Sequence, residues 1–154
     1  AFSISASLHQ AKIELMDLFT RQIENACIEK NWKFIDCGMK EGSRYCGFKI
    51  NFGYDIPNIG IGLEFQYAGY KMPIIGTWIN NLEIRDTELH QHIYNVIQPL
   101  FTENIRVSKH WPLYIELTHH ETEMWLQIQN GEFTDKLIRY FEKINTALKK
   151  LVSA

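Results

Sequence analysis

The chain has 154 residues, of which 45% are hydrophobic and 22% are charged, and its formal net charge is −2. This length suits a single domain, and the composition is that of a folded globular protein. A net charge near zero gives no overall field that favours nucleic acid or an anionic membrane, and the apolar runs are far shorter than the roughly 20 residues of a spanning helix. We therefore expect one domain that has no membrane association and binds any partner through a local surface.

Three cysteines, Cys27, Cys37 and Cys46, form an odd and sparse set without a CxxC pair. Such a set is typical of reduced thiols in a reducing compartment, and free cysteines usually behave as small core residues. We therefore expect a cytoplasmic protein with all three cysteines in the core. The chain starts at Ala1 without an initiator methionine, so we also expect it to be cut from a longer protein.

The first predicted element is a helix over residues 7–30. Ser7 and Gln10 have the spacing of a capping box, and apolar residues then recur at steps of three and four, namely Leu8, Ala11, Leu15, Phe19, Ile23 and Ala26. A short strand over residues 32–37 follows, and Gly38 and Gly42 mark the turn that ends it.

Strict alternation of apolar and polar residues is clearest over residues 44–67. One face would carry Cys46, Phe48, Ile50, Ile61, Leu63 and Phe65, while glycines and polar residues occupy the other face. Residues 55–58 have turn chemistry, which predicts a hairpin, and residues 72–79 form a further strand that begins near Pro73. The sequence therefore predicts an antiparallel meander over residues 32–79.

The C-terminal half is predicted to return to helices. Asp86 or Thr87 caps a helix that Pro99 kinks or ends, and a strand follows over residues 112–118. Residues 122–129 fit either a strand or a short helix ended by Gly131, and we favour the helix; the last helix is capped by Thr134. The predicted fold class is α+β, a mainly antiparallel sheet flanked by helices in the order αββββαβ(α)α.

The polar face of the predicted meander is the candidate binding site. Four glycines on it, Gly47, Gly60, Gly62 and Gly76, either leave the face bare for a helix or partner backbone, or reflect sheet twist and close helix packing. The same face is expected to carry five larger side chains, Lys49, Asn51, Glu64, Gln66 and Trp78. These would form a shallow polar groove with an aromatic wall, suited to a peptide or a nucleotide.

A metal site is the alternative interpretation of this hairpin. Asp55 at the turn could approach Glu64 and Gln66, and oxygen ligands of this kind suit Mg²⁺ or Mn²⁺, which can activate water for phosphodiester hydrolysis. The three residues resemble a degenerate PD-(D/E)XK nuclease motif in which Gln66 stands where the motif has a lysine. In this interpretation Asp55 and Glu64 are metal ligands, and Lys49 or Lys71 supplies positive charge.

A second resemblance covers about residues 30–150. Its marks are the segments GSRYCGFKI (42–50), IGIGLEF (59–65) and IGTW (75–78), followed by Trp125 through Asn130 and Gly131 to the last helix. These are similar to the C-terminal region of long bacterial proteins of the PD-(D/E)XK superfamily that are linked with phage defence. In such proteins the nuclease motif lies upstream and this region is an accessory domain, so the resemblance implies that Glu64 is a structural or binding residue.

Three functions follow from these observations as hypotheses. The leading one is a non-catalytic accessory or interaction domain of a bacterial nuclease-related protein, which recognises a partner domain, protein or nucleic acid through the polar face. The second is a metal-dependent nuclease that uses Asp55, Glu64 and Gln66 with Mg²⁺ or Mn²⁺. The third is a sensor that binds a small molecule between the meander and the helices.

Overall fold

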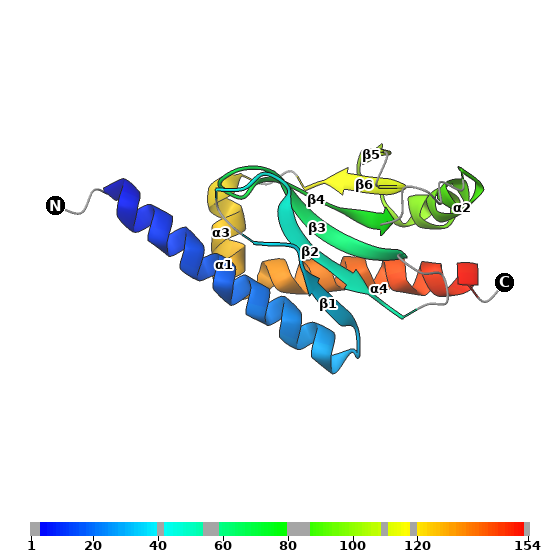
Figure 1. Ribbon diagram of the computed structural model, residues 1–154, viewed down its shortest axis with the longest axis horizontal. Coiled ribbons are helices and arrows are strands. Elements are labelled where there is room, and N and C mark those ends of the chain that lie inside the picture. Colours follow the sequence, from blue (N-terminus) through cyan, green and yellow to red (C-terminus); the bar gives the residue numbers. More distant parts are fainter. Residues whose placement is uncertain are drawn as a thin grey trace.

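The computed structural model describes residues 4–39, 42–53, 59–79, 87–108, 111–117 and 120–152. It has an α+β fold, as predicted, with helices packed on a mainly antiparallel sheet (Figure 1). The elements in chain order are α1 (Ile4–Glu29), β1 (Lys33–Asp36), β2 (Cys46–Asn51), β3 (Ile59–Tyr67), β4 (Lys71–Ile79), α2 (Thr87–Ile97), the 3-10 turn η1 (Gln98–Leu100), β5 (Ile105–Arg106), β6 (Leu113–Glu116), α3 (Glu121–Asn130) and α4 (Glu132–Val152).

The sheet has six strands in the order β1-β2-β3-β4-β6-β5, and every neighbouring pair is antiparallel. Strands β1 to β4 follow each other along the chain, which confirms the predicted meander. After α2 the chain returns to form β6 beside β4, with β5 on the outer edge. The two-residue strand β5 was not predicted, because Ile105 and Arg106 are too few to show an alternating pattern.

Several helix ends differ from the predicted ones. Helix α1 begins at Ile4, so Ser7 lies inside the helix and does not cap it. The segment that fitted either a strand or a short helix is a helix, α3, which was the favoured prediction. It ends at Gly131, whose φ of 85° only glycine adopts readily. Helix α4 begins directly afterwards at Glu132, so Thr134 is not a cap either; its hydroxyl donates to Oε1 of Gln22 at 2.6 Å and ties α4 to α1.

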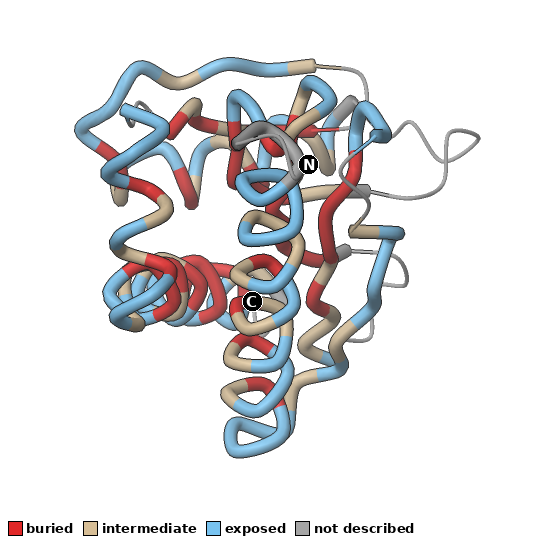
Figure 2. The backbone as a smooth tube through the Cα atoms, turned by 90° about the vertical axis from the view of Figure 1, so that its left-hand side faces the viewer, coloured by how far each residue is buried: buried red, intermediate tan, exposed pale blue. Residues whose placement is uncertain are grey.

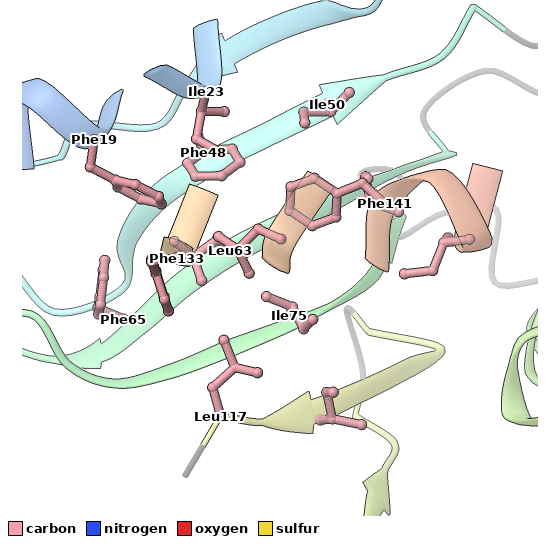
Figure 3. Packing of buried hydrophobic residues seen from close by; sticks show 14 of the residues in the cluster. Phe19, Ile23, Phe48, Ile50, Leu63, Phe65, Ile75, Leu117, Phe133 and Phe141 are labelled. Atoms are coloured by element: carbon pink, nitrogen blue, oxygen red, sulfur yellow. The ribbon is translucent and has the colours of Figure 1, made fainter. Parts of the chain in front are cut away.

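The helices gather on one face of the sheet, and the core lies between the two layers (Figures 1 and 2). Four aromatic rings form its centre, where α1, β2 and α4 meet (Figure 3). The Phe19 and Phe133 rings lie 5.2 Å apart between centroids, and Phe48 meets Phe141 edge-on at 6.1 Å. All four side chains are at most 1% exposed. None of the helices in the described ranges is both long and apolar enough to cross a membrane.

The cysteines do not all lie in the core. Cys27 and Cys46 are buried, but Cys37 is exposed, so the expectation for it was wrong. Cys37 directly follows the edge strand β1, and its N–H donates to the Gly47 carbonyl at 3.0 Å. This pairing continues the β1–β2 ladder and places Cys37 on the face opposite Phe48, away from the helices.

We expect the buried Cys27 thiol to make folding sensitive to alkaline pH. Burial, with the nearby Glu24 carboxylate, raises the pKa of Cys27 from 9.0 to about 11. Above pH 9 the unfolded chain loses this proton while the folded chain keeps it, so stability falls as the pH rises. The loss at pH 10 should be about 1.4 kcal/mol relative to pH 7. Urea unfolding at both pH values should show this loss in the parent protein and a smaller one in Cys27→Ala; equal losses would contradict the prediction.

Candidate binding face of the sheet

The register of the strands places all five predicted binding residues on one face. Lys49 of β2 pairs with Gly62 of β3, and Gly60 of β3 pairs with Trp78 of β4. Residues paired across strands share a face, as do residues two apart along a strand. The face directed away from the helices, called the open face below, therefore carries the predicted set, namely Lys49, Asn51, Glu64, Gln66 and Trp78. All five are half-buried.

Lys49 reaches across β3 to cover the ring of Trp78. Its Nζ lies 3.1 Å from the centroid of the indole, which is a close cation–π contact. The contact is possible because Gly62 stands between the two strands and has no side chain; a Cβ added there would lie 3.4 Å from Cγ of Lys49. Because Gly62 has no side chain, Lys49 of β2 can extend over β3 and contact Trp78 of β4.

The glycines do not leave the open face bare for a partner. A Cβ on Gly47, Gly60 or Gly76 would lie 2.0, 2.5 or 2.1 Å from a carbonyl oxygen of the neighbouring strand, so close approach of the strands requires glycine there. The space above Gly62 is already filled, because Cη2 of Trp111 would lie 3.3 Å from a Cβ at that position. The atoms that crowd these glycines belong to neighbouring strands and to Trp111 rather than to a helix, so the close contact is within the sheet and not the helix packing that was weighed for them.

Glu64 and Gln66 form a connected pair at one end of the open face. The Gln66 amide donates to Oε1 of Glu64 at 3.0 Å, and Nε of Arg44 donates to the Gln66 carbonyl at 3.3 Å. The Arg44 guanidinium also lies 5.0 Å from the ring of Tyr45 and 5.1 Å from the ring of Tyr67, both of which are exposed. Hydrogen-bonding groups and exposed aromatic rings therefore lie together at this rim.

Three titratable groups influence one another beside the indole. Burial lowers the pKa of Lys49, and the nearby Cys37 and Glu64 groups partly offset this because they favour its charged form. Burial likewise raises the pKa of the Cys37 thiol, while the Lys49 charge acts in the opposite direction. Desolvation is the largest cause in both cases. The ammonium group of Lys49 is therefore held in surroundings that disfavour its charge.

Only part of the proposed metal site, Glu64 and Gln66, falls within the described residues. Asp55 lies outside the described residues, so its distance to Glu64 is not defined. Within the described ranges no group of three or more His, Cys, Asp or Glu side chains is arranged to hold a metal ion. The amide N–H of Gln66 donates a hydrogen bond to Glu64. Oδ1 of Asn51 accepts a hydrogen bond from the Gly53 N–H at 2.7 Å. Asn51 therefore supports the turn after β2.

Three residues of the open face were missed as candidates. Tyr114 on β6 pairs with Gly76, and the Trp111 indole meets its ring at a centroid distance of 6.5 Å. Alternation does predict that Tyr114 points outward, but the sequence does not show that β6 lies beside β4. Trp111 precedes its strand and so has no periodic signal, while Cys37 was assigned to the core. The pairing of the strands brings each of these three residues to the open face.

Comparison with known proteins adds no relative. No family model matches the chain, and no curated protein or solved structure has a significant match.

Proposed function

We propose that the chain is a non-catalytic interaction domain of a bacterial nuclease-related protein, and that it binds a partner domain or protein through the open face. One observation carries the proposal, namely the half-buried Lys49 held 3.1 Å from the centroid of the Trp78 ring. Burial lowers the pKa of Lys49, so its charge is kept at a cost to folding. Charged groups kept at such a cost are commonest where they serve binding or catalysis.

The mixed chemistry of the open face favours a protein partner. It carries cations, Lys49 and Arg106, and carboxylates, Glu64 and Glu116, and Arg106 pairs with Glu116 at 3.6 Å. A surface with both signs of charge does not suit a polyanion, whereas partly exposed aromatic rings among polar groups are typical of protein interfaces. Core side chains such as Phe48 and Phe141 pack between the meander and the helices, where the sensor hypothesis would place its ligand.

Photo-cross-linking from the open face should identify the partner surface. With p-benzoylphenylalanine in place of Gln66, irradiation in the native cell should join the chain to one defined segment of a partner or of an adjoining domain. The same residue in place of Asn25, which is exposed on α1, is the matched control and should not reach that segment. Lys49→Met keeps an apolar stem over Trp78 but removes the charge, so it should weaken the cross-link while leaving the unfolding midpoint nearly unchanged.

Two outcomes would overturn the proposal. The first is a set of products that does not differ between positions 66 and 25. The second is saturable binding of Mn²⁺ in a calorimetric titration of the parent that Glu64→Ala abolishes and Gln127→Ala, on the distant helix α3, does not. That result would favour the alternative in which Asp55, Glu64 and Gln66 hold a divalent cation for phosphodiester hydrolysis.

A further inference from the structure

Four cations form a line along the outer side of α4, called the α4 stripe below. They are Lys136, Arg139, Lys143 and Lys150. Their spacings of three, four and seven residues place them within about 60° of one another on the helix and over a length of about 21 Å. The core residues of the same helix, Leu137, Phe141, Ile144 and Leu148, lie on its opposite side and are at most 1% exposed. The stripe therefore faces away from the sheet and is separate from the open face.

The acidic residues near the stripe are already engaged or lie at its start. Glu142 is paired with Lys30 at the end of α1, and Glu103 accepts a hydrogen bond of 2.6 Å from the Tyr140 hydroxyl. Glu132 and Asp135 lie in the first turn of α4, and residues 143–154 contain no acid. From Lys136 onward the surface is therefore predominantly positive, although the whole chain carries a net charge of −2.

The cations surround a hollow in the surface. Lys136, Arg139, Tyr140 and Lys143 line a depression of about 280 Å³. A second depression of about 240 Å³ shares Lys136 and Arg139 and is also lined by Gln127 and the carboxylates Glu132 and Asp135, so the positive surface begins beyond these two acids. The Tyr140 ring stacks on Phe101 at a centroid distance of 5.6 Å, which fixes this wall of the hollow. Burial and the hydrogen bond to Glu103 raise the pKa of Tyr140 from 10.0 to about 12, so its hydroxyl remains a donor to the Glu103 carboxylate.

We propose that the α4 stripe binds the phosphate backbone of a nucleic acid without reading its sequence. Like charges three and four residues apart weaken a helix, and in the part of the chain that the structure describes no salt bridge joins Arg139 or Lys143 to a carboxylate. Phosphates can supply counter-charges to Arg139 and Lys143, and a line of cations along a helix is the usual footprint of such binding. A membrane surface fits less well, because the apolar side of α4 is buried in the core.

Fluorescence anisotropy with labelled 20-nucleotide DNA, single-stranded and duplex, at 50 and 200 mM NaCl tests this proposal. The parent should bind more tightly at the lower salt concentration because binding releases counterions. Lys143→Glu should weaken binding at least tenfold. Lys149→Glu, the matched control, makes the same charge change at an exposed position on another side of α4 and should have an effect below about threefold. Replacing Lys136, Arg139 and Lys143 together with alanine should reduce the salt slope by about two to three.

Three results would overturn the proposal. One is the absence of salt-dependent DNA binding by the parent. Another is an equal loss in Lys143→Glu and Lys149→Glu, which would indicate a general charge effect. The third is binding of labelled ADP that depends on Lys143 without binding of either DNA, which would assign the hollow to a small phosphorylated ligand. Far-ultraviolet circular dichroism of each variant checks that the fold is retained, as expected for changes at exposed or half-exposed positions.

Discussion

Replacing Gly76 with alanine is expected to destabilise the protein by more than about 3 kcal/mol or to prevent folding. The new Cβ would lie 2.1 Å from the Leu113 carbonyl oxygen and 2.7 Å from Cα of Tyr114. Both atoms belong to the backbone of β6, so no side chain can move aside to relieve the overlap. The pairing of β4 with β6 would have to open, and this pairing joins the meander to the rest of the sheet.

Gly42→Ala is the matched control for this prediction. A Cβ at Gly42 has no atom within 4 Å, and its φ lies outside the left-handed region. The free energy of unfolding of this variant, measured by urea titration, should lie within about 0.5 kcal/mol of that of the parent. If Gly76→Ala unfolds at the same urea concentration as the parent, strands β4 and β6 do not lie as close together at Gly76 as the structure indicates.

Phe48→Ala is expected to cost about 3–5 kcal/mol, because it leaves a cavity where α1, β1, β2 and α4 meet. The Phe48 ring lies 6.1 Å from Phe19, 5.5 Å from Phe34 and 6.1 Å from Phe141, between centroids. The free energy of unfolding from urea titration, with the m-value followed in parallel, measures the loss.

Phe48→Leu and Leu126→Ala test whether packing is the cause. Phe48→Leu retains most of the volume and should cost less than Phe48→Ala. Leu126 is 58% exposed on α3, so its replacement by alanine should change stability by less than about 0.5 kcal/mol. A loss at Leu126 as large as that at Phe48 would mean that the α3 surface is covered in solution.

The strands were the most predictable part of the fold because their signal is local. Alternation in β2 and β3 identifies the buried side of each strand, and the register bears this out for Phe48 paired with Leu63. The helix starts were less predictable. Ser7 and Thr134 have the side chains of good caps, but tertiary packing extends both helices past them, and Thr134 instead bonds to Gln22. A capping pattern reports a local preference that packing can override.

The candidate site could be predicted only in part, because the position of β6 beside β4 has no local signal in the sequence. The placement of Lys49, Glu64 and Gln66 on one face follows from alternation alone. The predicted meander already places β2 and β4 on either side of β3, but the contact between Lys49 and Trp78 also needs the register of these strands. The position of Trp111 depends on β6 joining next to β4. The α4 stripe could have been found from spacing alone, since residues 136, 139, 143 and 150 share one side of a helix.

The ties between α1 and the last two helices have a consequence for biosynthesis. The Lys12–Glu121 bond spans 109 residues, and the Lys30–Glu142 and Gln22–Thr134 bonds each span 112. Local hairpins of the meander can pair as the chain leaves the ribosome, but their apolar side lacks the cover of α4 until the last helix has been made. The nascent chain therefore exposes Phe48 and Leu63 for most of its synthesis, and a chain stalled before α4 is expected to depend on chaperones to stay in solution.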